Sequence, residues 1–180
     1  MILGFIGKMG SGKTLSMTKY AKEYFDQGCK IYSNYNLNFK HEKIDIKKLL
    51  TMDDDLQNAV ILLDEIHIFI DSRESMRKKN RLISYFITQS RKRNLILMFT
   101  TQQMHQIDKR LRTNCNYFIM CSKKQVGSEA YIRNMIVSED DKRRVTFVKA
   151  SDYYDLYNTK QIIDFTEGLE NKESGGEKWF

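Results

Sequence analysis

Eight residues near the amino terminus have the types and spacing of a phosphate-binding loop. The segment Gly7–Thr14 reads GKMGSGKT and fits the pattern G-x-x-x-x-G-K-[ST] without deviation. Its glycines let backbone N–H groups curve around phosphate oxygens with no side chain in the way. Lys13 is expected to reach the β- and γ-phosphates, and the Thr14 hydroxyl to bind Mg²⁺. The expected nucleotide contacts come from Gly7, Lys8, Met9, Gly10, Ser11, Gly12, Lys13 and Thr14.

An apolar run that ends in two acids supplies a second element of nucleotide chemistry, the Walker B pattern. Residues 59–63 read AVILL and are followed by Asp64 and Glu65. A buried strand delivers its terminal carboxylates to the carboxyl edge of the sheet, where ligands of open α/β folds bind. Asp64 is expected to hold Mg²⁺, and Glu65 to act as general base toward a water that attacks the γ-phosphate. Together with the loop, these acids predict hydrolysis of ATP and not binding alone.

Polar and basic residues flank the next apolar run, residues 95–101. Gln102 follows it, and an amide at a strand end is suited to hydrogen-bond the γ-phosphate or the attacking water. Arg91 precedes it and is interpreted as an arginine finger that reaches a nucleotide held by a neighbouring subunit, with Arg93 a second candidate. The alternative, cations that stabilise a helix C-terminus through its dipole, stays open.

The charge of the chain favours a polyanionic partner. There are 30 Lys and Arg against 23 Asp and Glu, a net charge of +7 in 180 residues. A surface of this sign attracts nucleic acid first of all, with a solvated basic surface as the alternative. Four residues between Ser72 and Asn94 are expected to contact nucleic-acid phosphates without reading sequence: Arg73, Arg77, Lys78 and Lys79.

Composition also excludes several classes of protein. No run of 18 uncharged apolar residues exists in the sequence, so no membrane span of its own is expected. Cys29, Cys115 and Cys121 have no CxxC spacing and are interpreted as free thiols in a reducing compartment. The expected location is the cytoplasm, of a host cell if the protein is viral, or the virion.

The elements that must position these residues follow an α/β pattern. A helix is predicted over residues 13–27, a short basic helix over 107–113, and a short turn, helix or edge strand over 151–165. Apolar strands are predicted over residues 2–6, 29–33, 59–63, 95–101 and 117–121, with a short edge strand near 37–39. Runs that are apolar throughout are typical of parallel strands covered on both faces.

The C-terminal part of the sequence changes character. Residues 131–137 and 144–148 are separated by SEDDKR, which predicts an antiparallel hairpin, an extension over about residues 129–149. The predicted fold is an α/β P-loop NTPase with a mostly parallel central sheet flanked by helices. Residues 1–165 are assigned to the ATPase domain and residues 166–180 to a flexible acidic tail.

Taken in order, these motifs resemble the FtsK/HerA superfamily of DNA-pumping ATPases. The resemblance rests on DEIH at 64–67, SRKRN at 90–94 and TTQQ at 100–103, and it covers roughly residues 2–122. Two branches are similar: the compact poxvirus-type genome-packaging ATPases and the zonular-occludens-toxin-like proteins of filamentous phages. The stretches DSRESM and ITQSRKRN look especially like the second branch.

The resemblance implies roles and partners. Glu65, Arg91 and Gln102 occupy the positions of base, trans-acting arginine and sensor. It implies a hexamer or pentamer ring around double-stranded DNA, a capsid or membrane-protein partner, and viral genome packaging as the task. Other functions stay open: a phage assembly and export ATPase, a P-loop small-molecule kinase, or a DNA-binding scaffold without motor activity. His67 is equally compatible with a sensing and with a structural role.

Overall fold

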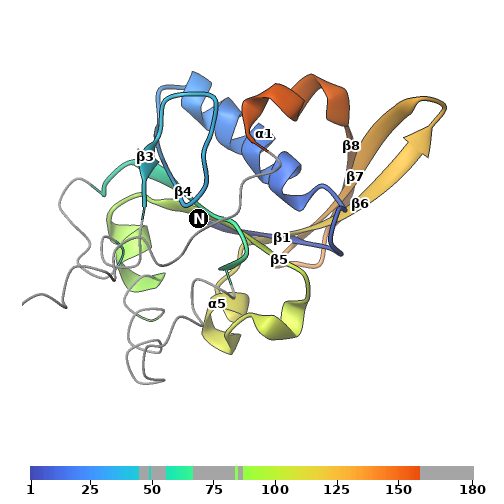
Figure 1. The fold of residues 1–180 in the computed structure, drawn as a ribbon. Helices are drawn as coiled ribbons and strands as arrows, with labels where there is room; N and C mark the ends of the chain where they lie inside the picture. Colours follow the sequence, from blue (N-terminus) through green and yellow to red (C-terminus); the bar gives the residue numbers. More distant parts are fainter. Residues whose placement is uncertain (45–48, 50–55, 67–83, 85–86, 159–180) are drawn as a thin grey trace, which may run out of the picture.

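One sheet of eight strands organises the protein, in the order β3-β2-β4-β5-β1-β6-β7-β8 (Figure 1). The computed structural model describes residues 1–44, 49, 56–66, 84 and 87–158. The strands are β1 (Ile2–Ile6), β2 (Lys30–Ser33), β3 (Glu42–Lys43), β4 (Ala59–Leu63), β5 (Ile96–Thr101), β6 (Tyr117–Val126), β7 (Glu129–Ser138) and β8 (Arg143–Lys149). This arrangement confirms the predicted α/β fold with a mostly parallel sheet.

The sheet has a parallel and an antiparallel part. From β3 to β6 every neighbouring pair is parallel, and β1 lies in the middle, with Leu3 opposite Met98 on one side and Tyr117 on the other. The predicted hairpin is present as β7 and β8, and β6 joins it to make three antiparallel strands. Strand β6 also continues to Val126, beyond the predicted end at Cys121, because residues 122–126, of which the first four are polar, pair with β7 through their backbone.

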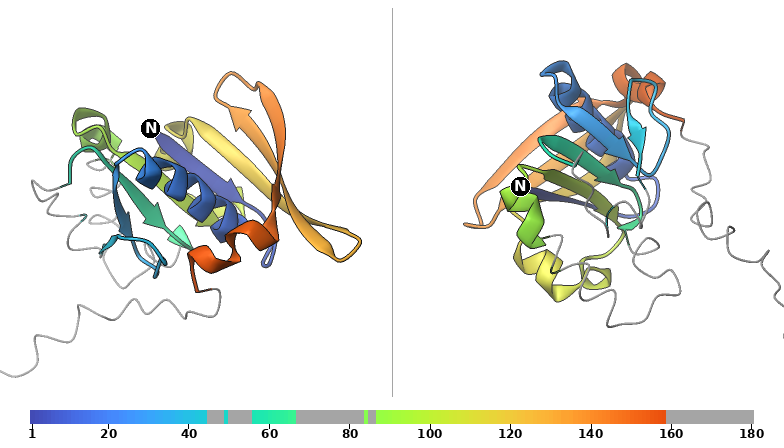
Figure 2. Two further views of the ribbon diagram at one scale, coloured as in Figure 1. Left: turned by 90° about the horizontal axis from the view of Figure 1, so that it is seen from above. Right: turned by 90° about the vertical axis from the view of Figure 1, so that its left-hand side faces the viewer.

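Helices cover both faces of the parallel part. Helix α1 (Lys13–Asp26) crosses one face, and the short helices η1 (Met104–Gln106) and α5 (Lys109–Thr113) lie on the other (Figures 1 and 2). Met17 and Ala21 of α1, four residues apart and so on one side of the helix, are buried in the core on this face of the sheet, and Leu15 is buried in the same core. No helix in the described ranges is long and apolar enough to cross a bilayer.

The core is divided between the two faces of the sheet. Residues that alternate along each strand pack on opposite sides, as Phe5 does toward α1 and Ile6 away from it. On the side away from α1, the described helices stop short of the antiparallel strands. There, Val145 and Phe147 of β8 are 43% and 59% exposed.

Two predictions near the edges of the fold need correction or remain open. The edge strand expected near residues 37–39 is wrong: Leu37 forms only an isolated bridge with Tyr157, and the edge strand is β3. The Asn38 N–H donates to the Leu156 carbonyl, which draws this segment away from the sheet and toward the short helix η2 (Ala150–Leu156). His67, the basic residues between 73 and 79, residues 159–165 and the predicted tail 166–180 lie outside the described residues.

Candidate active site

The predicted phosphate loop connects β1 to α1 at the carboxyl edge of the parallel strands. The Gly7 N–H donates to the Thr101 carbonyl at 3.4 Å, which ties the start of the loop to the end of β5. Gly10 and Gly12 have φ angles of 72° and 88°, a left-handed backbone that side chains disfavour. The glycines of the motif are therefore required by the shape of this turn.

The loop has the space and the unsatisfied groups that a phosphate would use. A Cβ on Gly10 would meet nothing within 4 Å, so this part of the loop is open among the described residues. The Ser11 hydroxyl is buried and has no hydrogen-bond partner within the described part of the chain. A buried polar group without a partner costs free energy, and a bound anion would remove that cost. The loop thus fits a nucleoside triphosphate.

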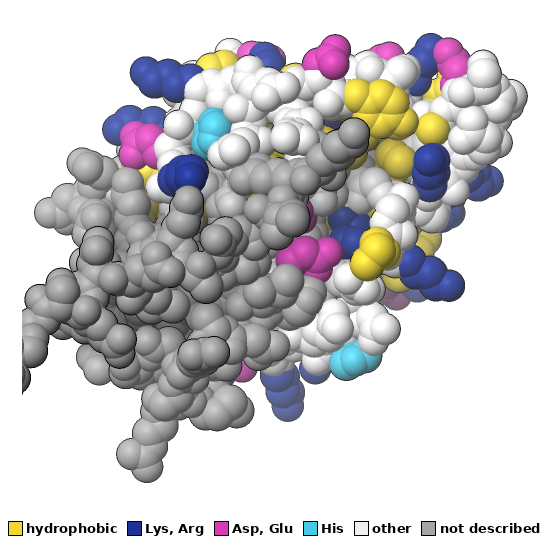
Figure 3. All heavy atoms as spheres, viewed as in Figure 1, with side chains coloured by type: hydrophobic (Ala, Val, Ile, Leu, Met, Phe, Trp, Pro, Cys, Tyr) yellow, Lys and Arg dark blue, Asp and Glu magenta, His cyan; other side chains and the backbone are white. Residues whose placement is uncertain are grey.

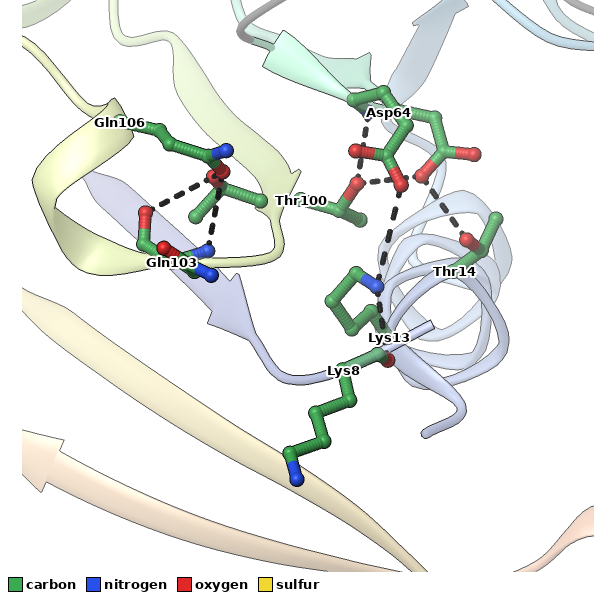
Figure 4. Close-up of polar contacts among 9 residues, drawn as sticks. Lys8, Lys13, Thr14, Asp64, Thr100, Gln103 and Gln106 are labelled. Atoms are coloured by element: carbon green, nitrogen blue, oxygen red, sulfur yellow. Dashed lines mark hydrogen bonds and ion pairs between the residues drawn. The ribbon is translucent and has the colours of Figure 1, made fainter. Parts of the chain in front are cut away.

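Lys13 lies where a phosphate-binding lysine is needed. Its side chain is buried, and its ammonium group donates to the Lys8 carbonyl at 3.3 Å. The same ammonium is 4.0 Å from Oε1 of Glu65 (Figure 4). The structure therefore brings together the lysine of the first motif and the proposed base of the second.

Thr14 and Asp64, the two residues predicted to bind Mg²⁺, are in direct contact. The Thr14 hydroxyl donates to Oδ1 of Asp64 at 3.0 Å, although 50 residues separate them in the sequence (Figure 4). Burial raises the pKa of Asp64, and hydrogen bonds from Thr100 and Thr14 partly oppose this rise. A hydroxyl and a carboxylate that converge on one point are oxygen ligands of the kind that Mg²⁺ prefers. These residues therefore fit the ion.

Thr100, in the middle of the site, holds both acids of the second motif. Its hydroxyl donates to Oδ1 of Asp64 at 2.6 Å and accepts the backbone N–H of Glu65 at 2.8 Å (Figure 4). Glu65 itself has a φ of 50°, so its backbone needs support from its surroundings. The sequence prediction missed this role; the available signal was a polar side chain inside the core strand β5.

Asn34, which directly follows β2, was also missed. Its amide makes two hydrogen bonds with the backbone of Asp64: Oδ1 accepts from the Asp64 N–H at 2.8 Å, and Nδ2 donates to the Asp64 carbonyl at 3.0 Å. Because an asparagine after a strand is common in turns, its sequence position alone does not reveal this function. Asn34 and Thr100 together hold the backbone of Asp64 and Glu65, and Thr100 also orients the Asp64 carboxylate.

Gln102, the predicted sensor, lies at the same edge of the sheet. It directly follows β5, next to the Thr101 carbonyl that receives the first N–H of the phosphate loop. Its neighbours form a small network of their own, in which Oε1 of Gln106 accepts from the Gln103 N–H at 3.2 Å and the Thr101 hydroxyl at 3.3 Å (Figure 4). The position suits a residue that contacts the γ-phosphate.

Arg91, the predicted finger, lies at the opposite edge. It comes before β5, at the end of the sheet where the Met1 amino group donates to the Leu95 carbonyl at 3.0 Å. Arg91 is exposed, and its carbonyl accepts the Asn94 N–H at 3.4 Å in the turn that leads into β5. Arg91 and Lys13 are thus separated by the length of the parallel strands, and Arg91 does not belong to its own chain's site.

Basic side chains outside the site are dispersed. Figure 3 shows Lys and Arg side chains at several separate places on the described part of one face, with acidic side chains near its middle. Two cations of the described chain are paired with acids: Lys19 with Glu23 at 2.7 Å on α1, and Lys149 with Glu129 on the antiparallel strands. The described surface therefore offers separate cations and no large basic patch on this face.

The sequence of residues 3–123 matches the model of the ATPase family associated with various cellular activities (AAA). The chain therefore belongs to this family, and the predicted ATPase is confirmed. Comparison with curated protein sequences gives no significant match.

Solved structures show the same fold. The N-terminal domain of zonular occludens toxin from Neisseria meningitidis matches with a TM-score of 0.63 and 18% identity, covering 87% of this chain and 98% of that one. The DNA-packaging ATPase B204 from Sulfolobus Turreted Icosahedral Virus matches with a TM-score of 0.55 and 13% identity, covering 80% and 95%. A KaiC-like protein from Pyrococcus horikoshii gives 0.55 and 14%, covering 82% and 83%. Both branches of the sequence resemblance are thus confirmed at the level of the fold.

Proposed function

We propose that this ATPase couples Mg²⁺-dependent hydrolysis of ATP to the movement of double-stranded DNA, with packaging of a viral genome as its task. The meeting of Lys13, Asp64 and Glu65 at one edge of the sheet carries the hydrolytic half of the proposal. The DNA half is supported by the net charge of +7 and by a fold shared with a DNA-packaging ATPase.

Each side chain at the edge has a distinct part in this reaction. The Lys13 ammonium and the loop N–H groups would neutralise charge that develops on the phosphates. Glu65 would accept a proton from the attacking water, and Gln102 would hydrogen-bond that water or the γ-phosphate. The Thr14 hydroxyl and the Asp64 carboxylate would hold Mg²⁺, which when bound neutralises charge on the β- and γ-phosphates.

A complete site would need a second subunit. Arg91 lies at the far edge of its own sheet, a position compatible with contact to the nucleotide of an adjoining chain in a hexamer or pentamer ring. Such an arginine stabilises charge in the transition state of phosphoryl transfer. Arg73, Arg77, Lys78 and Lys79 are proposed to contact DNA phosphates.

The deciding experiment measures steady-state ATP turnover with and without double-stranded DNA for the native chain, Glu65→Gln and Arg91→Ala. DNA should stimulate the native protein. Glu65→Gln should lose turnover by at least ~100-fold and keep ATP binding, since only the base is removed. Arg91→Ala should also lose turnover, and mixing it with Glu65→Gln protein should restore part of it. A native monomer whose turnover is independent of concentration and DNA would refute the motor.

A filamentous-phage export ATPase is the second candidate. It is favoured by the match to the zonular occludens toxin domain, 98% of which this chain covers. A coding sequence that continues into a membrane-spanning segment would support export. A small-molecule kinase is distinguished more simply, because phosphate release without any added acceptor would exclude it.

A further inference from the structure

Strand β7 touches the helix that follows the phosphate loop, although it contains no nucleotide motif. The Ser16 hydroxyl, two residues after Thr14, donates to Oδ1 of Asn134 at 3.0 Å, and both side chains are fully buried. Ser16 also lies in the first turn of α1, where its N–H donates to the Gly12 carbonyl at 2.9 Å. The turn that carries Lys13 and Thr14 is therefore fastened to β7.

The two ends of the loop rest on the same antiparallel strands. A Cβ on Gly12 would lie 2.7 Å from Cγ1 of Ile132, which is on the same face of β7 as Asn134. A Cβ on Gly7 would lie 2.5 Å from the Cys121 carbonyl of β6, and Cys121 is the cross-strand partner of Asn134. A side chain at either glycine would therefore collide with these strands, so the glycine backbone itself packs directly against β6 and β7. Strands β6 and β7 thus form the floor of the phosphate loop.

A buried asparagine such as Asn134 lowers the stability of the fold unless its amide is fully hydrogen-bonded. It is fully buried in the face that packs on α1, among Ile132, Val148 and Cys121. The Nδ2 of Asn134 has no hydrogen-bond partner among the described residues. The hydroxyl of Thr146, the residue opposite Asn134 on β8, has none either. An apolar side chain would fill this space without that cost. An apolar side chain, however, could not accept the hydrogen bond from Ser16.

The same strands extend well past the site. The ladder with β1 ends where Met120 lies opposite Ile6, and β6 continues for six more residues to Val126, about 20 Å of extended chain. Figure 2 shows this β6–β7 ribbon projecting beyond the edge that carries the loop. Its base is therefore linked to the phosphate loop, and its tip is free to meet other molecules.

We propose that Asn134 is a positioning residue of the ATP site, which acts through Ser16 to fix the first turn of α1. It couples the β6–β7 ribbon to nucleotide affinity. This inference needs ATP binding at the loop but neither DNA movement nor a ring. Coupling of this kind is reciprocal: if the position of β7 changes ATP affinity, then ATP must stabilise β7 by the same free energy.

The first test measures the affinity for a non-hydrolysable ATP analogue by calorimetry. Asn134→Ala should weaken binding about tenfold, the effect of one lost buried hydrogen bond. Thr146→Val is the matched control, since it removes a neighbouring buried polar group that makes no bond to α1, and it should bind as the native chain does. Equal losses of affinity in both variants would refute the proposal.

A double-mutant cycle guards against simple loss of stability. Ser16→Ala should weaken binding as much as Asn134→Ala, and the double variant no more than either single one, because both remove the same bond. Additive losses would show that the two residues act separately and would contradict the proposal. Ser16→Ala is also the variant to use if Asn134→Ala fails to fold.

Hydrogen exchange supplies a readout that is independent of turnover. Adding the analogue with Mg²⁺ should slow exchange across residues 130–136 of the native chain and have little effect there in Asn134→Ala. An absence of protection in a native chain that binds the analogue would overturn the coupling. A native chain that binds no analogue at all would instead refute the ATPase function, so the two failures are distinguishable.

Discussion

The parallel and antiparallel parts of the sheet contribute different kinds of residues to the candidate active site. Strands β1 and β4 are buried along their whole length, and the residues of the two nucleotide motifs follow their carboxyl ends. Strands β6, β7 and β8 alternate or are exposed and carry no motif, and residues of β6 and β7 pack against the phosphate loop. Catalytic groups can therefore be recognised in a sequence more easily than the groups that support them.

The largest expected contrast between the two parts is in stability. Phe99 of β5 is fully buried in the core, whereas Phe147 of β8 is 59% exposed. Phe99→Ala should lower the free energy of unfolding by about 3–5 kcal/mol, because it leaves a cavity. Phe147→Ala should change it by less than about 0.5 kcal/mol, as exposed substitutions do. Urea denaturation of both variants measures this, and similar losses would mean that the face of Phe147 is covered.

The junction between the parts is tested at Gly12. Gly12→Ala should destabilise the protein by about 1–3 kcal/mol, since it adds strain at a positive φ and a clash with Ile132. Gly10→Ala is the matched control, with a φ of 72° but no neighbour within 4 Å. The difference between the two thermal unfolding curves isolates the contact with β7. It should shrink in an Ile132→Ala background, and an unchanged difference would contradict this packing.

A smaller effect is expected at Thr100, which supports the acids from within the parallel part. Thr100→Val removes the hydroxyl that accepts the Glu65 N–H and donates to Asp64. Turnover should fall by about tenfold or more, because two hydrogen bonds to the acids are lost, while ATP affinity is largely kept. Thr100→Ser retains the hydroxyl and should keep most of the activity. If Thr100→Ser is as slow as Thr100→Val, packing of the methyl group, and not the hydrogen bonds, is responsible.

The smallest effect is a pH dependence at Asp64. Burial raises its pKa above the usual 3.8, so the native state binds a proton more tightly than the unfolded state does. The free energy of unfolding therefore falls as pH rises from 3.8 through the raised pKa, and it stays lower above that value.

Asp64→Asn should remove this dependence. The variant should melt at a higher temperature than the native chain near about pH 8, with a smaller difference near about pH 4, while ATP turnover is lost. Thermal melts in Mg²⁺-free buffer measure this difference. A native chain that is the more stable of the two at about pH 8 would contradict it.

Much of the parallel part could be predicted from the sequence. The predicted strands 2–6 and 59–63 coincide with β1 and β4, and the helix over 13–27 ends one residue early at Asp26. These elements are defined by continuous apolar runs, helical spacing and glycines, which are local signals. Lys13, Thr14, Asp64 and Glu65, which the structure brings together, belong to motifs with the same kind of local signal.

The rest depends on partners that are distant in the sequence. The outer half of β6 is polar and forms a strand only because β7 pairs with it. Asn34 and Thr100 are single polar residues whose roles depend on where Asp64 comes to lie. In the sequence, Asn134 is one polar residue within a strand. Its role becomes visible only in the structure, where the Ser16 hydroxyl donates to it.

The central place of β1 in the sheet also has a consequence for synthesis on the ribosome. β1 leaves the ribosome well before its two neighbours in the sheet, β5 and β6, with Ile2 opposite Leu97 and Leu3 opposite Tyr117. Contacts of such long sequence separation form late and slowly. Strands β6 and β7, which pack beneath the phosphate loop, are both present only after the chain has been translated to Ser138. Strand β1 therefore gains its full set of contacts only after much later segments have been made, and a nascent chain should acquire ATP affinity only after β7 has been translated.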